Sequence, residues 1–431
     1  MACKAGYILV KRPMQCIIIT IGDELLIGQT IDTNSAWMAQ QLNLLGIAVT
    51  RRIAIADERN AIINALNETV GKTDLVLLTG GLGPTADDIT KPVLCGYFGG
   101  KLVVNLEVQE HVRKIFSKSD RPILQRNLAQ AEVPDVCTVL FNRVGTAPGM
   151  WFENDGTIVV AMPGVPFEMQ AIMEDEVLPR ISKAFITNNI LHKTLITAGM
   201  GESYIAEQIA AIEQSLPAHI SLAYLPSPGM VKLRLTAQGN NRSELESEIE
   251  IFAVQIKQRL GIIVAADEDI SMEQIIVNLL KQHQRTVTFA ESCTGGYLAH
   301  RLTLVPGASE VFNGSMVTYA NAIKQRYLHV PDTVLQTDGA VSEATVLQMA
   351  TQARIMFEAD IAIAVSGILG PGGGTDEKPV GLVWIGLATT LHAYARKFLF
   401  RHDRVRNKEL IFQAAYDMLR KELLAENGVE G

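Results

Sequence analysis

Four short apolar runs, each ending in glycine or polar residues, constrain the fold more than any other feature of the sequence. They are CIIITIG (16–22), DLVLLTGG (74–81), TVTFAES (286–292) and DIAIAVSG (360–367). Continuous apolar runs of this length are typical of strands buried on both faces, and such strands occur in sheets that helices cover on two sides. The sequence therefore predicts an α/β protein.

The 431-residue chain is too long for one ordinary core, so several domains are expected. Strands alternate with helices over residues 15–180, which predicts a parallel sheet covered on both faces. Residues 181–268 contain two strand-like and two helix-like segments, and we expect a small α+β middle domain there. A second α/β domain is predicted over residues 269–431, where Ser271 and Gln274 form a capping-box signature ahead of an apolar helix.

Composition excludes several classes of protein. The longest apolar runs fall short of the roughly 18 residues that a membrane-spanning helix needs, so no membrane partner is expected. A net charge of −8 argues against binding the phosphate backbone of nucleic acid. The five cysteines are scattered without metal-ligand spacing, which indicates free thiols in a reducing cytoplasm.

The glycine-rich stretch TGGLGPTADD (79–88) is the first candidate site, because ligands of parallel sheets bind beyond the carboxyl ends of the strands. Its glycines permit a phosphate to approach the backbone closely, and a helix N-terminus follows. Asp87 and Asp88 are suited to hold a divalent cation, with Asp23 or Asp57 completing its oxygen shell. That chemistry fits a pyrophosphate or a nucleotide. A strand-to-helix turn with capping aspartates explains the same pattern, and the residues alone leave both interpretations open.

The stretches GDELLIGQTIDTN (22–34), TGGLGPTADDITKP (79–92), GTAPGM (145–150) and MPGVPFEM (162–169) resemble the N-terminal domain of the CinA family of competence/damage-inducible proteins. This resemblance implies a three-layer α/β/α, molybdopterin-binding (MoaB/MogA-like) domain that hydrolyses the pyrophosphate of ADP-ribose with a divalent cation (Mg, Mn or Co). The positions that match the family's cleft are Asp23, Asn34, Asp57, Gly80, Gly81, Gly83, Thr85, Asp87 and Asp88. Molybdopterin handling is the alternative, although the motif here reads GGLGPTADD rather than GGTG.

The second candidate site is AESCTGG (290–296), in which Ser292, Cys293 and Thr294 are adjacent potential nucleophiles. A cysteine thiol reacts as the thiolate and needs a nearby base or cation. His300 lies about two helical turns further on and is no evident partner. We therefore expect the Cys293 thiol to have a packing role.

The segment GSMVTYANAIK (314–324) offers a base for Ser292. Removal of Lys324 from water would lower its pKa and let its amine accept the serine proton. Tyr319 would relay that proton or orient the lysine. A solvated helix lysine and a half-buried strand tyrosine explain the same residues, so the pattern alone does not decide between these roles.

Five motifs of this region match the C-terminal domain of the CinA family over nearly its full length: AESCTGG, VPGAS (305–309), VTYANAIK, GAVSEAT (339–345) and SGILGPGGGTDEKPVG (366–381). That domain resembles nicotinamide-nucleotide amidases, which convert nicotinamide mononucleotide to nicotinic acid mononucleotide and ammonia without a cofactor. The resemblance places the catalytic serine, tyrosine and lysine on Ser292, Tyr319 and Lys324. It implies that the substrate binds at Thr294, Gly295, Gly296, Ser309, Ser366, Gly367, Gly372, Gly373, Gly374, Arg404 and Arg406.

Arg404 and Arg406 lie in HDRVRN (402–407), and a planar guanidinium is well suited to pair with the substrate phosphate. The family pattern here is often GDR followed by a more distant arginine. His402 replaces that glycine, so the sequence leaves open which arginine serves.

These features together predict a bifunctional cytoplasmic enzyme of pyridine-nucleotide salvage, which the family resemblance implies to be a homodimer. A non-enzymatic competence or damage-response regulator is an alternative of a different class. Residues 1–13 precede the usual start of the family, and we interpret them as an extension or as a start codon assigned too early.

Overall fold

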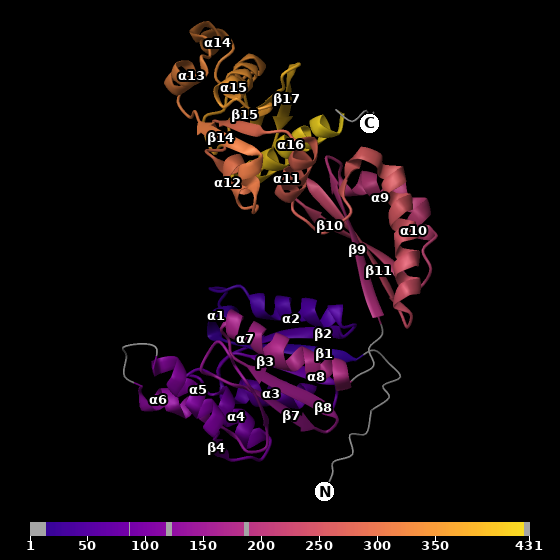
Figure 1. The fold of residues 1–431 in the computed structure, drawn as a ribbon, viewed down its shortest axis with the longest axis vertical. Helices are drawn as coiled ribbons and strands as arrows, with labels where there is room; N and C mark the ends of the chain where they lie inside the picture. The colour runs from indigo at the N-terminus through magenta and orange to yellow at the C-terminus, as the bar shows by residue number, and fades with distance from the viewer. Residues whose placement is uncertain (1–13, 86, 118–122, 185–188, 426–431) are drawn as a thin grey trace. The chain divides into compact units, whose positions relative to one another are not determined.

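The structure is a computed structural model that describes residues 14–85, 87–117, 123–184 and 189–425 (Figure 1). The predicted N-terminal extension, residues 1–13, lies outside the described residues. Spatial contacts divide the chain into two compact units. The first comprises residues 1–191 and 238–242, and the second comprises residues 192–237 and 243–431.

A six-stranded sheet in the order β2-β1-β3-β8-β7-β6 forms the centre of the first unit. Its strands are β1 (Gln15–Ile21), β2 (Ala48–Ile55), β3 (Leu75–Thr79), β6 (Thr138–Leu140), β7 (Gly149–Asn154) and β8 (Thr157–Met162). Strands β2, β1, β3 and β8 are parallel, whereas β7 and β6 are antiparallel to their neighbours. The prediction of a parallel sheet is therefore wrong at this edge. The two-residue turn Asp155–Gly156, with positive φ at both residues, closes β7 and β8 into a hairpin.

Helices cover both faces of this sheet. One face carries α2 (Thr33–Leu44), α7 (Pro166–Ile172) and α8 (Leu178–Ala184), and the other carries α3 (Arg59–Thr69) and α4 (Thr90–Tyr97). Residues of β1 alternate between the two cores, with Ile18 on the α2 side and Ile19 on the α3 side. The predicted three-layer α/β/α architecture is confirmed. The other described elements are α1 (Asp23–Leu26), β4 (Leu102–Val104), α5 (Leu106–Ser117), α6 (Gln125–Leu128) and β5 (Glu132–Pro134).

The middle region folds as the predicted α+β module. Its sheet has the order β10-β11-β9-β12 and consists of β9 (Asn189–Ala198), β10 (Ile220–Ser227), β11 (Met230–Gly239) and β12 (Val264–Ala266). Helices α9 (Glu202–Gln214) and α10 (Arg242–Leu260) run along this sheet (Figure 1). Most of the module belongs to the same compact unit as the C-terminal region. The reason is that Ile196 and Ala198 of β9 are part of the C-terminal hydrophobic core.

The C-terminal region has a five-stranded sheet in the order β14-β13-β15-β16-β17. Its strands are β13 (Val287–Glu291), β14 (Phe312–Val317), β15 (Ile361–Gly367), β16 (Leu382–Ala388) and β17 (Ala393–Leu399). Strands β14, β13 and β15 are parallel, and β16 and β17 are antiparallel. The helices are α11 (Met272–His283), α12 (Tyr297–Thr303), α13 (Asn321–Leu328), α14 (Asp332–Thr337), α15 (Glu343–Met356) and α16 (Arg404–Ala425).

These helices pack into two separate hydrophobic cores, one on each face of the sheet. Residues of α11, α12 and α16 pack with Phe289 and Ile363 on one face of the sheet, whereas α13 and α15 pack against small residues such as Ala290 and Ala364 on the other. The capping signature is confirmed, because the side chain of Ser271 accepts a hydrogen bond from the backbone N–H of Gln274. The C-terminal region is thus a second three-layer α/β/α domain.

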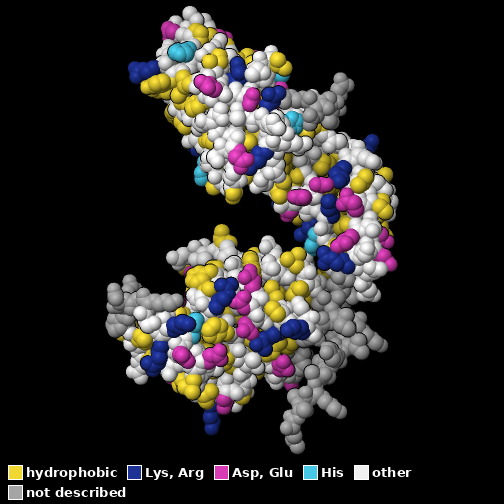
Figure 2. Space-filling view, in the orientation of Figure 1, with side chains coloured by type: hydrophobic (Ala, Val, Ile, Leu, Met, Phe, Trp, Pro, Cys, Tyr) yellow, Lys and Arg dark blue, Asp and Glu magenta, His cyan; other side chains and the backbone are white. Residues whose placement is uncertain are grey.

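Charged side chains of both signs are interleaved on the face of the molecule shown in Figure 2, where dark blue Lys and Arg alternate with magenta Asp and Glu. Within the described part of the chain, no helix combines the length and the apolar character needed to cross a membrane.

The fold makes a test of the C-terminal core possible at Phe289. This side chain is fully buried, and its ring centroid lies 5.5 Å from that of Phe312 and 5.9 Å from that of Tyr416. Phe289→Ala should lower the free energy of unfolding by about 3–5 kcal/mol, because it leaves a cavity between the sheet and the helices that cover this face. Leu391→Ala is the control, since Leu391 is 88% exposed. Urea denaturation should separate the two variants, and equal midpoints would contradict the assigned core.

Candidate functional sites

Ser292 lies directly after β13, at the carboxyl edge of the C-terminal sheet. The backbone N–H of Ser292 donates to the carbonyl of Val365 at 3.0 Å, which fixes its position relative to β15. Lys324 reaches the same point from α13, and its Nζ lies 3.0 Å from Ser292 Oγ. Both side chains are buried, with Lys324 1% exposed and Ser292 8% exposed. The structure therefore brings together the predicted nucleophile and its predicted base.

The surroundings of Lys324 make its ammonium group easier to deprotonate. Burial lowers its pKa to about 8. Its Nζ also lies 2.7 Å from the carbonyl oxygen of Thr318 and 3.1 Å from that of Tyr319. A neutral amine has two N–H groups, which these carbonyls accept, and one lone pair, which remains directed toward the Ser292 hydroxyl. This arrangement is able to take a proton from the serine.

Tyr319 contacts Lys324 through its backbone carbonyl, whereas its side chain is 61% exposed. The phenol oxygen accepts a hydrogen bond from Arg404 Nη2 at 3.1 Å. Arg404 also donates from Nη1 to the carbonyl of Gly370 at 2.9 Å. Arg404 thus links the tyrosine phenol to the loop after β15, and the position of the Tyr319 side chain in this structure does not support a proton relay to Lys324.

Glu291 holds the turn that carries Ser292, and sequence reasoning missed it. Its fully buried carboxylate accepts hydrogen bonds from the backbone N–H groups of Gly296, Leu298 and Ala299, at 3.0, 3.1 and 3.0 Å. Gly296 has φ 92°, a conformation in which glycine is strongly favoured. The signal in the sequence was a carboxylate at the end of an apolar strand. Because Glu291 occupies the N-terminus of α12, the Gly296 N–H is engaged within the protein.

The other residues predicted to bind the amidase substrate differ in their surroundings. Gly372, Gly373 and Gly374 are exposed in the loop after β15, at the edge of the sheet that carries Ser292. Ser366 is buried, and its hydroxyl donates to the carbonyl of Ala340 at 2.6 Å. The adjacent Gly367 ends β15, and its Cα faces the backbone of β16. Thr294 and Gly295 follow Ser292 in the turn, and the buried Thr294 Oγ1 has no hydrogen-bond partner among the described residues.

The prediction that Ser309 joins this site is wrong within one chain. Ser309 lies in the 3₁₀ turn Ala308–Glu310, just before the first residue of β14. Strands β13 and β14 are parallel and start at the same edge of the sheet, with Val287 paired to Phe312. The five residues of β13 span about 16 Å, so Ser309 and Ser292 lie at opposite edges.

The structure distinguishes the two arginines. Arg404 contacts the loop after β15, and its charge acts on the neighbouring Cys293 thiol. Arg406 instead lines a separate pocket of about 350 Å³, together with Tyr297 and Pro228. Arg404 is therefore the arginine that contacts Tyr319 and the loop after β15.

Cys293 is buried, as expected for a packing role. Burial raises the pKa of its thiol to about 12, and the charge of Lys324 opposes this shift without overcoming it. The thiol is therefore protonated at neutral pH.

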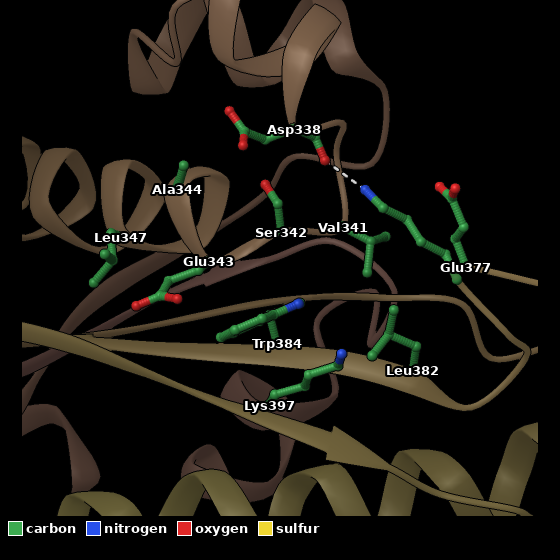
Figure 3. Close-up of a pocket in the computed structure, with 11 residues that line it drawn as sticks. Asp338, Val341, Ser342, Glu343, Ala344, Leu347, Glu377, Leu382, Trp384 and Lys397 are labelled. Carbon is green, nitrogen blue, oxygen red and sulfur yellow. Dashed lines mark hydrogen bonds between the residues drawn. The ribbon is translucent and has the colours of Figure 1, made fainter.

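A further pocket of about 560 Å³ lies beside this site, between the start of α15 and strands β16 and β17 (Figure 3). Trp384 and Lys397 form its floor, and Ser342 and Glu343 come from the start of α15. Lys378 is also part of the lining, and its amine donates to the carbonyl of Asp338. Ser292 and Lys324 are not among the residues that line it, so this pocket is distinct from the serine–lysine pair.

A pocket of about 340 Å³ opens at the carboxyl edge of the N-terminal sheet. Its walls come from the loops after β1, β2, β3 and β8, the turn before β7 and the start of α7. The predicted residues that line it are Gly80, Gly81, Gly83, Asp57, Asp87 and Asp88, and those that sequence reasoning missed include Glu24, Gln130 and Glu168. Glu168 lies within the motif MPGVPFEM, where it was a signal available from the sequence.

Three further residues predicted for this cleft do not line the pocket, but each forms a hydrogen bond with a residue that does. Asp23 Oδ1 accepts from the backbone N–H of Asp57 at 3.3 Å. Asn34 Nδ2 donates to the carbonyl of Gly164 at 2.8 Å. The hydroxyl and the backbone N–H of Thr85 both donate to the carboxylate of Asp88.

Negative charge accumulates around Asp57. Burial, together with the charges of Asp88, Asp87, Asp23 and Glu24, raises the pKa of its carboxyl to about 6. Its Oδ1 is buried without a hydrogen-bond partner in the part of the chain that the structure describes. Among these same described residues, no three acidic, His or Cys side chains lie close enough to form a ready metal centre. A cation would relieve the repulsion, but the carboxylates would have to close around it.

The fold and the two sites define a multidomain α/β protein, with a molybdopterin-binding type of N-terminal domain and a buried serine–lysine pair in its C-terminal domain. Residues 17–183 match the probable molybdopterin binding domain, residues 192–264 the damage-inducible protein CinA KH domain, and residues 269–423 the CinA C-terminal domain. The chain belongs to the CinA family, which confirms the resemblance found in the sequence.

Its relatives extend over nearly the whole chain. A CinA-like protein of Cytophaga hutchinsonii is 44% identical over 406 residues, which cover 94% of this chain and 97% of that protein. A CinA-like protein of Flavobacterium psychrophilum is 42% identical over 413 residues, covering 95% and 99%. A crystal structure of the protein CinA with unknown function from Thermoplasma acidophilum is 32% identical. It covers 39% of this chain and 99% of that one, with a TM-score of 0.36.

The assigned state of Cys293 is open to direct measurement. With a pKa of about 12, roughly one thiol in ten thousand is ionised at pH 8, so iodoacetamide should leave Cys293 unlabelled in the native protein. Peptide mass spectrometry should find the same thiol fully labelled in urea, which serves as the control. Fast labelling of Cys293 in the native state would show instead that the thiolate is activated.

Proposed function

We propose that this CinA-family chain is a bifunctional hydrolase of pyridine-nucleotide salvage. The C-terminal domain would deamidate nicotinamide mononucleotide, and the N-terminal domain would cleave the pyrophosphate of ADP-ribose. The observation that carries the first activity is the 3.0 Å contact between Lys324 Nζ and Ser292 Oγ in a buried environment.

The deamidation follows from that contact. Ser292 Oγ attacks the carboxamide carbon of the substrate while its proton passes to Lys324 Nζ. The C–N bond then breaks, and Lys324 returns the proton to the departing ammonia, which leaves an ester on Ser292. A water molecule attacks this ester while Lys324 accepts its proton. The bond between the acyl carbon and Ser292 Oγ then breaks, Lys324 returns the proton to Ser292 Oγ, and nicotinic acid mononucleotide is released.

The residues around the pair support a phosphorylated substrate. Arg404 supplies a positive charge, and Tyr319 with the carbonyl of Gly370 holds its guanidinium in place. The exposed glycines that follow Gly370 offer backbone that a ribose phosphate is able to approach. We assign phosphate binding to Arg404 rather than to Arg406, which faces a different pocket.

The N-terminal pocket supports the second activity through its lining. Gly80, Gly81 and Gly83 present backbone to the space, and Asp57, Asp87 and Asp88 present carboxylates. A pyrophosphate would be repelled by this cluster unless a divalent cation stood between them. We propose that Asp57, Asp87 and Asp88, with Asp23 alongside, hold Mg, Mn or Co when substrate is bound. The cation would neutralise charge on the phosphate oxygens.

We further propose that the enzyme works in the cytoplasm as a homodimer and acts on nucleotides alone, without nucleic-acid or membrane partners. A regulator without catalytic activity would have no need of a buried lysine against a serine. The crowded carboxylates of the N-terminal pocket suit a cation and a pyrophosphate, which favours pyrophosphate hydrolysis over simple handling of molybdopterin.

The serine–lysine pair predicts the effect of substitutions on ammonia release from nicotinamide mononucleotide. Ser292→Ala and Lys324→Ala should each lower kcat by about a thousandfold or more, and the double variant should be little worse, because the two residues act as one unit. Lys324→Arg should be as inactive, since a guanidinium keeps its proton. Cys293→Ala is the matched control and should retain most activity. If Ser292→Ala were active and Cys293→Ala inactive, the nucleophile would be the Cys293 thiolate and the serine–lysine mechanism would be wrong.

The same pair predicts the pH dependence of deamidation. The pKa of Lys324 is lowered to about 8, so the neutral base is scarce below that pH and predominates above it. The value of kcat/KM should therefore rise with pH through about 8 and then level off. A rate that stays constant between pH 6 and pH 9 would rule out Lys324 as the base.

The acidic pocket predicts a requirement for metal in ADP-ribose cleavage. Excess chelator should abolish release of AMP, and added Mg, Mn or Co should restore it. Asp57→Asn and Asp88→Asn should each raise the metal concentration needed for half-maximal rate, because each removes a charged oxygen ligand. Deamidation by the same preparation is the internal control. If AMP release were undiminished in excess chelator, the reaction would not require a divalent cation.

A further inference from the structure

Glu168 is a carboxylate of the N-terminal pocket that the proposed cation would not use. It lies in the first turn of α7 and lines the pocket with Gly164 and Val165. The acidic cluster around Asp57 comes instead from the loops after β1, β2 and β3. Two kinds of carboxylate therefore face the same space from different segments of the chain.

A buried amide holds the Glu168 side chain in place. Asn142 Nδ2 donates to Glu168 Oε2 at 2.8 Å and to the carbonyl of Ala147 at 2.9 Å. Asn142 Oδ1 accepts from the backbone N–H of Val144 at 3.1 Å. The asparagine is 3% exposed, so its orientation is set by three bonds inside the protein. The carboxylate of Glu168 is consequently fixed at the wall of the pocket.

Gly145 provides the space that this carboxylate fills. A Cβ at Gly145 would lie 2.2 Å from Glu168 Cδ and 2.3 Å from Oε2, far inside van der Waals contact. The motifs GTAPGM and MPGVPFEM thus meet at one point, where the absence of a side chain at residue 145 admits the glutamate. Contacts with a second segment of the chain therefore determine the conformation of the Glu168 side chain.

Glu168 comes from a different segment of the chain than the acidic cluster, although both line the pocket. Burial raises the pKa of its carboxyl, and the hydrogen bond from Asn142 opposes that shift. On its own side of the pocket, the charged Arg143 is paired with Asp175 at 2.5 Å. Among the described residues, the carboxylate of Glu168 therefore has Asn142 as its one side-chain hydrogen-bond partner and faces the pocket.

We propose that Glu168 is the catalytic base that activates water for cleavage of the phosphoanhydride, an inference that rests on the proposed ADP-ribose hydrolysis. Its carboxylate removes a proton from a water molecule as the water oxygen forms a bond to one phosphorus atom. The bond between that phosphorus and the bridging oxygen breaks, and the bridging oxygen leaves with the electron pair on the second phosphate. Two phosphate monoesters, AMP and ribose 5-phosphate, result, and Glu168 releases its proton to solvent.

Glu168→Gln tests this role, because glutamine keeps the shape and still accepts the bond from Asn142. We expect kcat for AMP release to fall by about a hundredfold or more, with KM for ADP-ribose within about twofold of the wild type. Wild-type kcat should decline as pH falls toward the pKa of Glu168, and this acid limb should be absent from the residual activity of Glu168→Gln. Calorimetric binding of ADP-ribose and the melting temperature should both be unchanged.

A pair of glycine variants tests the geometry independently of the carboxylate itself. Gly145→Ala should displace Glu168 and reproduce the loss in kcat. Gly96→Ala in α4 is the matched control, because a Cβ there meets its nearest atom at 3.7 Å, an ordinary contact. Both glycines have backbone conformations that alanine adopts readily, so strain does not separate them.

The outcomes distinguish this inference from the proposed function. A wild-type protein that releases no AMP with any of the three metals would overturn both. An active wild type with an equally active Glu168→Gln would overturn the role of Glu168 alone. A variant that binds ADP-ribose normally, melts normally and has lost kcat and the acid limb would establish it.

Discussion

The central strands of both sheets are covered by helices on two faces, and the position of every polar group in the two sites depends on that constraint. An unpaired polar group inside such a strand would lose its contact with water, so polar residues collect where the strands end. Strand β13 is apolar up to Glu291 and Ser292, and β3 is apolar up to the glycines of the N-terminal pocket. Parallel pairing then brings these ends to one edge, where each site forms.

Removal from water sets the protonation of the groups that gather there. At Lys324, burial penalises the positive charge and leaves an amine whose pKa is about 8. At Asp57, burial and four neighbouring carboxylates penalise the negative charge and raise the pKa to about 6. Burial thus moves the pKa values of Lys324 and Asp57 toward neutral pH. The first residue lies beside the Ser292 hydroxyl, and the second lies among carboxylates that a cation would stabilise.

Two glutamates, the fully buried Glu291 and the half-buried Glu168, show how hydrogen bonding separates a structural carboxylate from a reactive one. Glu291 accepts three backbone N–H bonds at the start of α12, which stabilise its charge and tie the turn of Ser292 to the helix. Glu168 accepts a single bond from Asn142 and faces a pocket. With fewer donors to satisfy it, Glu168 retains the capacity to take a proton, which is the physical basis for assigning it a part in the chemistry.

The sequence by itself determined the fold class and the three regions, because hydrophobic periodicity and motif order are properties of contiguous residues. The pairing of Ser292 with Lys324 was implied by the family resemblance of those motifs. The tertiary structure decided what depends on strand order and direction. It placed Ser309 at the far edge of the sheet, put Arg404 rather than Arg406 against the loop after β15, and turned β7 antiparallel to β8. Contacts such as Glu168 with Gly145 and Asn142 join segments more than 20 residues apart. A local sequence pattern does not specify contacts between distant segments. Two residues with the same pattern of apolar neighbours lie at the same edge of a sheet or at opposite edges, depending on how their strands pair.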